Sequence, residues 1–213
     1  MNPNKLETYK VEPDDDFNFF DRNKSFEQIK TPAELFGYMH NNIKYGFVDK
    51  NNHKIYSPQQ EGWGVGDAFP RAYYLQAPEE LLASQHGTCW DQTELERSWF
   101  SKHNYEFKTF ILMFGREISQ KNPAHTFLAY QDKNKWNWFE NTLDERNNGI
   151  HQFENFDDLV AEVKNIITNN AINNGATEED LKKINFCEYE APAAGCNSDK
   201  FINNIINRYK SGD

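Results

Sequence analysis

HGTCWDQTELERSWF, residues 86–100, contains the start of a helix with a cysteine in its first turn. Gly87 gives a flexible entry, and Thr88 with Asp91 three residues later resembles a capping box, which predicts Cys89 at the helix start. The free backbone N–H groups and the dipole of a helix start favour a thiolate over a thiol. The same N–H groups can hold an oxyanion, so Cys89 is a candidate nucleophile. The alternative interpretation is a buried cysteine with a structural role.

Two aromatic-rich stretches follow this helix, HTFLAYQ at 125–131 and NKWNWFENT at 134–142, and both are typical of strands. Asp132-Lys133 between them predicts a hairpin turn. In an antiparallel hairpin the numbers of facing residues add to a constant, and a turn at this position makes that constant 265. His125 and Glu140 are therefore expected to face each other on one side of the hairpin.

A histidine beside a carboxylate can serve as the base that a cysteine nucleophile needs. Glu140 would orient the imidazole of His125 and stabilise its charged form. A loop of odd length would present Asn141 or Phe139 to His125 instead, so Asn141 is the reserve third member. His86 is an alternative base, because it lies close to the cysteine in sequence. The other interpretation of the pair is an ordinary polar contact on a solvated face.

The order of the remaining elements, helices followed by strands and then helices, predicts an α+β fold. We expect an extension over residues 1–30 and a single domain over residues 31–213. The expected helices are TPAELFGYMHNNIKYGF (31–47) with Thr31 as N-cap, a helix from about Pro78, a helix over 156–167 and a helix capped by Ser198. The expected strands include 107–114 and 185–190, and the glycine-rich stretch 49–70 is expected to be a loop.

Composition narrows the class of protein. The 213 residues are 15% aromatic, which is enough to build a core, and the net charge of −10 argues against nucleic acid as a partner. No apolar run is long enough to cross a bilayer, and the first residues lack the apolar stretch of a signal peptide. We therefore expect a cytoplasmic protein with no membrane partner; the oligomeric state stays open.

The cysteine content fits a reducing compartment. Cys89, Cys187 and Cys196 are few and odd in number, which disfavours a fold held by disulfides. No CxxC pair or Cys/His ligand spacing is present, so neither a metal nor a cofactor is expected. Cys187 and Cys196 are expected to have structural roles.

Three segments in this order resemble the transglutaminase-like superfamily of papain-fold enzymes: GTCWD at a helix start, a histidine that opens a strand, and WNWFENT on the next strand. The resemblance covers about residues 35–145 and is closest to small bacterial members. It implies a papain-like core in which the nucleophile helix packs on an antiparallel sheet. It also implies that Cys89 is the nucleophile, His125 the general base and acid, and Glu140 the third member. The sequence departs from the family at Glu140-Asn141, where Asp-Pro is usual.

Such a site would perform acyl transfer on amide bonds of a peptide or protein, through a thioester on Cys89. Hydrolysis or deamidation is the preferred outcome, because a small single-domain chain resembles the hydrolytic bacterial members. The alternatives are a protein-glutamine transamidase and an inactive transglutaminase-like binding module. An arylamine acetyltransferase-like enzyme would use the same Cys-His-carboxylate arrangement and is a less favoured alternative than these two.

The oxyanion and the substrate cleft have several candidates. The backbone N–H of Cys89 is one oxyanion donor, and a second could come from Gln60 or Trp63 in the glycine-rich loop, or from Gln85. Trp90, next to the nucleophile, is a candidate wall of the cleft, although a core tryptophan fits the same position.

Overall fold

The computed structural model describes residues 25–49, 51, 53–55, 72–114, 124–173, 175–182 and 184–211. The helical segments are η2 (Phe26–Gln28), α1 (Pro32–Asn42), α3 (Pro78–Ser84), α4 (Cys89–Lys102), α5 (Phe156–Asn173), α6 (Glu178–Leu181) and α7 (Ser198–Ser211). The long strands are β5 (Phe107–Phe114), β6 (Ala124–Asp132), β7 (Lys135–Glu140), β8 (Gly149–Phe153) and β9 (Ile184–Glu188). Four short strands complete the set: β1 (Lys44–Tyr45), β2 (Phe47–Val48), β3 (Lys54–Ile55) and β4 (His86–Gly87).

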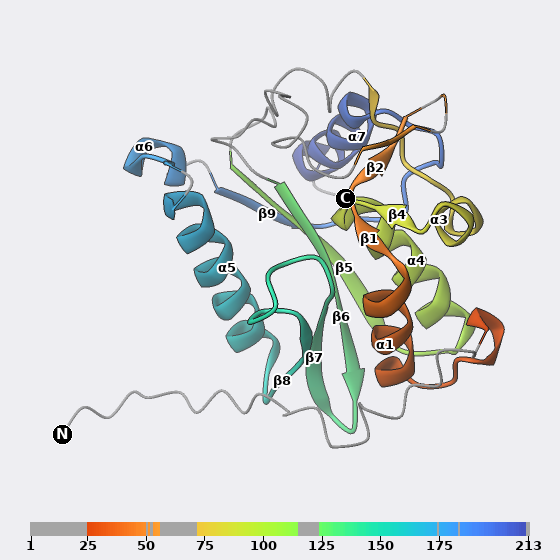
Figure 1. Cartoon of the computed structure of the whole chain (residues 1–213). Helices are drawn as coiled ribbons and strands as arrows, with labels where there is room; N and C mark the ends of the chain where they lie inside the picture. The colour runs from red at the N-terminus through yellow and green to blue at the C-terminus, as the bar shows by residue number, and fades with distance from the viewer. Residues whose placement is uncertain are drawn as a thin grey trace.

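The five long strands form one antiparallel sheet with the order β8-β7-β6-β5-β9. Helix α5 lies on one face of this sheet, and α1 and α4 lie on the other (Figure 1). The predicted α+β class is confirmed.

Helix α4 is central to the fold, because every residue in its first two turns, 89–96, is buried. The helix contributes Leu95, Trp99 and Phe100 to a core that also contains Leu128 and Tyr130 of β6. A helical segment that is surrounded on all sides needs no amphipathic pattern, which explains why polar residues in the first two turns of α4 are buried along with apolar ones. Each of these polar groups then needs a partner inside the protein.

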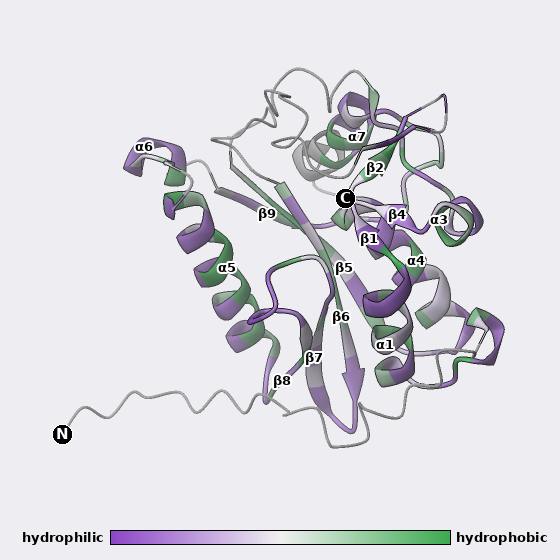
Figure 2. Cartoon of the chain, in the orientation of Figure 1, coloured by the Kyte–Doolittle hydropathy of each residue, from purple (hydrophilic) through white to green (hydrophobic). Residues whose placement is uncertain are grey.

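Helix α5 covers the opposite face of the sheet with residues spaced one turn apart. Leu159, Val163, Ile167 and Ala171 are buried in a cluster that also contains side chains of β5, β6 and β7. Figure 2 shows that α5 carries both hydrophobic and hydrophilic residues along its length, as expected for a helix with one covered side. The helical period over 156–167 is confirmed.

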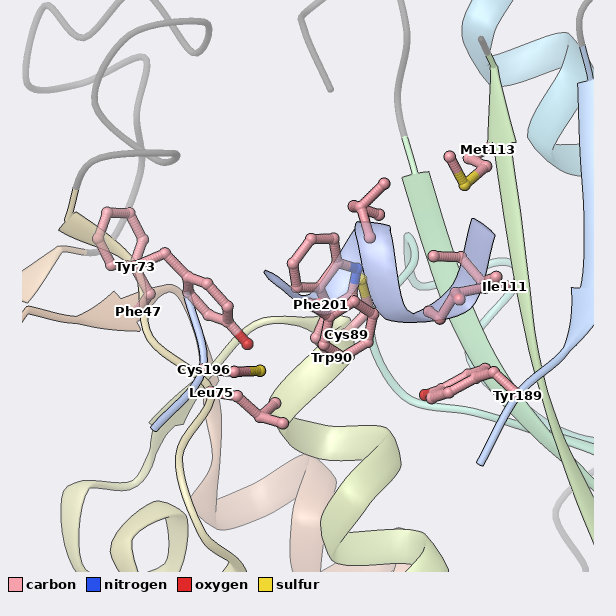
Figure 3. Packing of buried hydrophobic residues seen from close by; sticks show 12 residues of the cluster. Phe47, Tyr73, Leu75, Cys89, Trp90, Ile111, Met113, Tyr189, Cys196 and Phe201 are labelled. Carbon is pink, nitrogen blue, oxygen red and sulfur yellow. The ribbon is translucent and has the colours of Figure 1, made fainter. Parts of the chain in front are cut away.

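A third cluster surrounds the first turn of α4 and joins it to the C-terminal helix. Trp90 stacks on Phe201 of α7 with ring centroids 4.0 Å apart, and Tyr73 meets Trp90 edge-on. Figure 3 shows Cys89, Trp90 and Phe201 together at the centre of this cluster, between Tyr73 on one side and Ile111 of β5 on the other. The start of α4 is therefore fixed by both earlier and later parts of the chain.

The helix expected over 31–47 is shorter than predicted. Its start is confirmed, since Thr31 accepts a hydrogen bond from Glu34 N and the Glu34 carboxylate accepts one from Thr31 N. The helix ends at Asn42, and the chain then extends into β1 and β2. β1 pairs in parallel with β4, whose partner residues lie about 40 positions later, and such a distant pairing leaves no local signal.

The hairpin turn lies one residue later than predicted. The turn residues are Lys133-Asn134, not Asp132-Lys133, and both have positive φ, 52° and 65°. A two-residue turn of this type needs positive φ at both positions, which asparagine tolerates well. Facing residues therefore add to 267, as in the pair Asp132 and Lys135, and the predicted constant of 265 is wrong.

Other differences are local. The cap of α7 is Asn197, whose side chain accepts a hydrogen bond from Lys200 N, and not Ser198, which begins the helix. Strand β3 lies inside the stretch expected to be a loop, and β8 was not predicted. Ile29, within the expected extension, is fully buried in the same cluster as α1. No described helix is long and apolar enough to span a membrane.

Candidate active site

Cys89 is the first residue of α4, as the sequence predicted, and only 5% of its surface is exposed. Thr88 precedes it as the N-cap residue, and its N–H and hydroxyl both donate to the Asp91 carboxylate, at 2.8 and 2.9 Å. Cys89 therefore belongs to the helical turn whose N–H groups have no partner within the helix. This is the arrangement that favours an anion at Cys89.

Asp91 holds the helix start in place instead of taking part in chemistry. Besides the two Thr88 donors, its second oxygen accepts hydrogen bonds from Gln76 N at 2.9 Å and from the Tyr73 hydroxyl at 3.1 Å. Burial raises the pKa of Asp91 to about 6, although these donors act in the opposite direction. A fully buried carboxylate with four donors is a structural hub, which agrees with the capping role expected from sequence.

His125 and Glu140 form a direct hydrogen bond, in which Nε2 of the imidazole lies 2.7 Å from Oε2 of the carboxylate. Both side chains are buried, with 7% and 1% of the side-chain surface exposed. The ladder between β6 and β7 ends at Leu128 and Phe139, so the two residues lie just past its end. They are diagonal neighbours in the continued register, not direct partners, because moving the turn by one residue shifts the facing position by two.

The second oxygen of Glu140 is also fully engaged. Its Oε1 accepts hydrogen bonds from Thr142 N at 2.7 Å, from the Thr142 hydroxyl at 2.9 Å and from Leu143 N at 3.2 Å. Burial alone would raise the pKa of Glu140, but the charge and hydrogen bond of His125, aided by Thr142, lower it below its ordinary value. Glu140 is therefore an ionised carboxylate in a fixed orientation.

The imidazole of His125 interacts with Cys89 as well as with Glu140. Burial lowers the pKa of His125, but the Glu140 charge and the hydrogen bonds of Cys89 and Glu140 outweigh it and raise the pKa to about 10. Because Nε2 is bonded to Glu140, Nδ1 is the nitrogen left for the cysteine sulfur. Cys89, His125 and Glu140 are thus brought together in the order that a nucleophile, a base and an orienting group require.

Two polar contacts hold the start of β6 and the end of β7 against the first turns of α4. The Thr93 hydroxyl donates to Thr126, next to His125, at 3.1 Å. Asn141, next to Glu140, donates its amide to Gln92 at 2.8 Å, and Gln92 donates to Gly87 O at 3.0 Å. Asn141, the reserve third member, is therefore part of this support, and Glu140 occupies the position beside the histidine.

Tyr45 is a further residue of the site, which the sequence did not indicate. The parallel ladder of β1 and β4 pairs it with Gly87, two residues before the cysteine. Its hydroxyl lies beside Cys89, and the pKa of Tyr45 is raised well above its ordinary value by burial of the hydroxyl and then by the charge of Cys89. The residue as a whole is 51% exposed, so the ring reaches solvent while the hydroxyl points inward.

Glu96 is a second buried group that the sequence did not single out. Only 3% of it is exposed, and its Oε2 has no hydrogen-bond partner among the described residues. Burial, followed by the negative charge of Glu140, raises the pKa of Glu96 well above its ordinary value. A neutral Glu96 is consistent with an ionised Glu140 nearby, because two close carboxylates do not both ionise readily.

Trp90 and Gln85, two other candidates from the sequence, have environments different from that of the cluster. Trp90 is 2% exposed and packs on Phe201, as expected for the core tryptophan that the sequence offered as the alternative. Gln85 ends α3 with an exposed side chain, and its carbonyl accepts a hydrogen bond from Lys44 N. Gln60 and Trp63 lie outside the described residues.

His86, the alternative base, has a different environment from His125. It is buried, and its Nδ1 lies 2.8 Å from Ser84 O. Burial lowers the pKa of His86, and the hydrogen bond with Ser84 opposes this only in part. No described contact joins it to Cys89, so the histidine of the cluster is His125.

No family model and no curated protein sequence matches this chain. The resemblance to transglutaminase-like enzymes therefore stays a prediction from three segments. Among the described residues, no group of three or more His, Cys, Asp or Glu side chains is arranged to hold a metal ion.

Proposed function

We propose that this protein is a cysteine-dependent acyl-transfer enzyme with a transglutaminase-like, papain-type core, acting on amide bonds of a peptide or protein. Cys89 is the nucleophile, His125 the general acid and base, and Glu140 the orienting carboxylate. The observation that carries the proposal is the buried 2.7 Å bond between His125 and Glu140, with Cys89 on the same imidazole at a helix start. A histidine with a purely structural role would not need a cysteine thiol at a helix start beside its second ring nitrogen.

The chemistry follows from the charges of the cluster. The Cys89 thiolate attacks the amide carbon and forms a C–S bond, while the carbonyl π electrons move to the oxygen. When this oxyanion collapses, the C–N bond breaks, and His125 transfers its proton to the leaving amine. A thioester on Cys89 remains. Water, deprotonated by the now neutral His125, then attacks the thioester, and the C–S bond breaks to release the acid and restore the Cys89 thiolate beside a protonated His125.

Hydrolysis and deamidation are the outcomes that we propose for the thioester, and transamidation is the alternative. They differ only in whether water or an amine reaches it. A cytoplasmic location is part of the proposal, and the three free cysteines support it. An inactive binding module is the opposing hypothesis, and thiol reactivity separates it from an enzyme.

Alkylation of the native protein tests the nucleophile. Iodoacetamide below neutral pH should modify Cys89 faster than Cys187 or Cys196, because a paired thiolate reacts and a neutral thiol does not. His125→Ala should remove this excess. Peptide mapping by mass spectrometry reports each site in one sample, so Cys187 and Cys196 are internal controls. Equal, slow labelling of all three cysteines would favour the binding module.

A peptide with an internal glutamine and an added primary amine tests the acyl transfer. Deamidation, cleavage and amine incorporation give three different product masses. Cys89→Ser should abolish every product and leave the unfolding temperature close to wild type, because the change is nearly isosteric. Product formation by Cys89→Ser would contradict the assignment of the nucleophile.

A further inference from the structure

The hydroxyl of Tyr45 lies beside Cys89, although the Cys89, His125 and Glu140 triad does not require a fourth polar group. The parallel ladder places Tyr45 opposite Gly87, and Gly46 N donates to Gly87 O at 3.3 Å directly after it. Both contacts join β1 to the residues immediately before Cys89. The position of Tyr45 relative to the helix start is therefore set by backbone hydrogen bonds and does not depend on a flexible loop.

Tyr45 also differs from the other residues around the cysteine in its exposure. Cys89, His125 and Glu140 are at most 6% exposed, whereas Tyr45 is 51% exposed. Most large apolar side chains of the described residues are buried, and Tyr45 is an exception. An exposed tyrosine beside a buried sulfur is available to a substrate that approaches Cys89 from solvent.

The protonation of the Tyr45 hydroxyl matters for the chemistry. Burial and the neighbouring Cys89 raise the pKa of Tyr45 well above its ordinary value, so the phenol keeps its hydrogen and is available as a donor beside the reacting atom. In the tetrahedral intermediate the oxyanion is two bonds from the sulfur. A donor that contacts the sulfur in the resting site thus needs only a small shift to reach that oxygen.

On the basis of the proposed function, we propose that Tyr45 is a catalytic residue that donates its hydroxyl to the oxyanion, together with the backbone N–H of Cys89. When the C–S bond forms, the negative charge moves from sulfur to oxygen, and the Tyr45 hydrogen bond follows it. No proton is transferred: the phenol keeps its hydrogen throughout, and the amine leaves with the proton of His125. Tyr45 takes the role for which the sequence offered Gln60, Trp63 or Gln85.

The test compares two reactions of Cys89 that differ in one respect. Acetylation by p-nitrophenyl acetate passes through a tetrahedral oxyanion, whereas alkylation by iodoacetamide is a displacement at carbon that forms none. Tyr45→Phe removes the donor and keeps the ring. The ratio of the acetylation rate to the alkylation rate cancels any change in the amount of thiolate, and we expect it to fall about 100-fold, as for loss of one oxyanion donor.

Nitrophenolate release is measured after subtraction of the Cys89→Ala background, and alkylation is measured at Cys89 by peptide mapping. Tyr105→Phe is the matched control, because Tyr105 packs on Trp99 and Phe100 beyond the other end of α4, and its ratio should equal that of wild type. Thermal unfolding should show that Tyr45→Phe is folded.

Two results would contradict the inference, and they are distinguishable. If wild-type Cys89 reacts with iodoacetamide no faster than Cys187, the proposed function fails and the role of Tyr45 with it. If Cys89 is reactive but Tyr45→Phe keeps the wild-type ratio, the triad stands and Tyr45 is not an oxyanion donor. If Tyr45→Phe changes the acetylation and alkylation rates by the same factor, the ratio is also unchanged. This outcome shows an effect on the thiol alone and contradicts the oxyanion role.

Discussion

At the scale of single residues, the protonation of His125 governs the site. Its pKa of about 10 keeps the imidazole charged at neutral pH, opposite an ionised Glu140. Because this value lies above the ordinary 6.5, the contribution of His125 to folding stability is complete once the pH is below 6.5 and is lost as the pH rises through about 10. On the acid side the contribution of Glu140 is lost as the pH falls through its lowered pKa.

Glu140→Gln should move the titration of His125. The variant keeps the shape of the side chain but removes the charge that opposes burial, so the pKa of His125 should fall from about 10 toward 6.5. Side-chain NMR of the histidine ring against pH measures this directly. His53, which is exposed and pairs with Asp49, is an internal reference in the same spectra. An unchanged titration of His125 would mean that Glu140 does not control it.

The sequence singled out three residues that the structure brings together, Cys89, His125 and Glu140. It did not single out the residues that contact and support them. Cys89, His125 and Glu140 each carry a chemical signal within a recognisable segment. Gln92 and Tyr45 carry none, because a glutamine in a helix and a tyrosine after one are ordinary. Their roles depend on contacts with Asn141 and Cys89, at distances along the chain that no local pattern encodes.

At the scale of elements, the junction of β4 and α4 leaves no free space. A Cβ on Gly87 would lie 2.6 Å from Leu81 Cδ1 and 2.9 Å from the Asp91 Cβ. Leu81 is fully buried, so it has no room to move aside. The glycine that the sequence indicated as a flexible entry is thus required for close packing of α3 against α4.

Gly87→Ala should therefore destabilise the protein by about 1–3 kcal/mol, as overpacking of a tight site does. It should also slow the alkylation of Cys89, because Asp91 and the helix start must shift together. Chemical denaturation measures the first effect and peptide mapping the second. Ser98→Ala, on the exposed side of α4, is the control for a change that adds no contact. Wild-type stability of Gly87→Ala would contradict the packing argument.

The hairpin shows what alternation can and cannot predict. The expected register was wrong by one turn position, yet His125 and Glu140 are hydrogen bonded. A shift of one residue in the turn moves each facing partner by two positions, and side chains two apart share a face. The face was therefore predictable, whereas the exact partner depended on the backbone conformation of Lys133 and Asn134.

At the scale of the whole molecule, helix α4 places several acids in the interior. The pKa values of Asp91, Glu94 and Glu96 are all raised, in each case first by burial. Such a group binds its proton more strongly in the folded than in the unfolded chain. The unfolded chain therefore ionises first as the pH rises, and the free energy of unfolding decreases between the two pKa values.

Glu96→Gln should remove the contribution of Glu96 to the decrease of the unfolding free energy with rising pH. The variant should be about as stable as wild type near pH 4 and more stable at neutral pH, with up to about 1.4 kcal/mol gained per pH unit in between. Denaturation curves across this range give the slope. Glu106→Gln, on the exposed residue after α4, should run parallel to wild type. Parallel curves for Glu96→Gln would mean that Glu96 is charged when folded.

The class of fold was predictable from the sequence, but the way its ends meet was not. Leu75 exchanges backbone hydrogen bonds with Gly195 and Cys196, and Trp90 stacks on Phe201. Each pairing joins residues about 110 or more apart, and many apolar partners would satisfy the same burial. Periodicity identifies which side of a helix is covered, and only the folded chain determines what covers it.

The turn at Lys133-Asn134 lies at the opposite end of β6 and β7 from His125 and Glu140. Lys133 and Asn134 are exposed. A fluorescent label or an affinity tag inserted there would extend into solvent without entering the reaction zone. The same hairpin that carries His125 and Glu140 thus offers a convenient attachment point for following binding of a test peptide in real time.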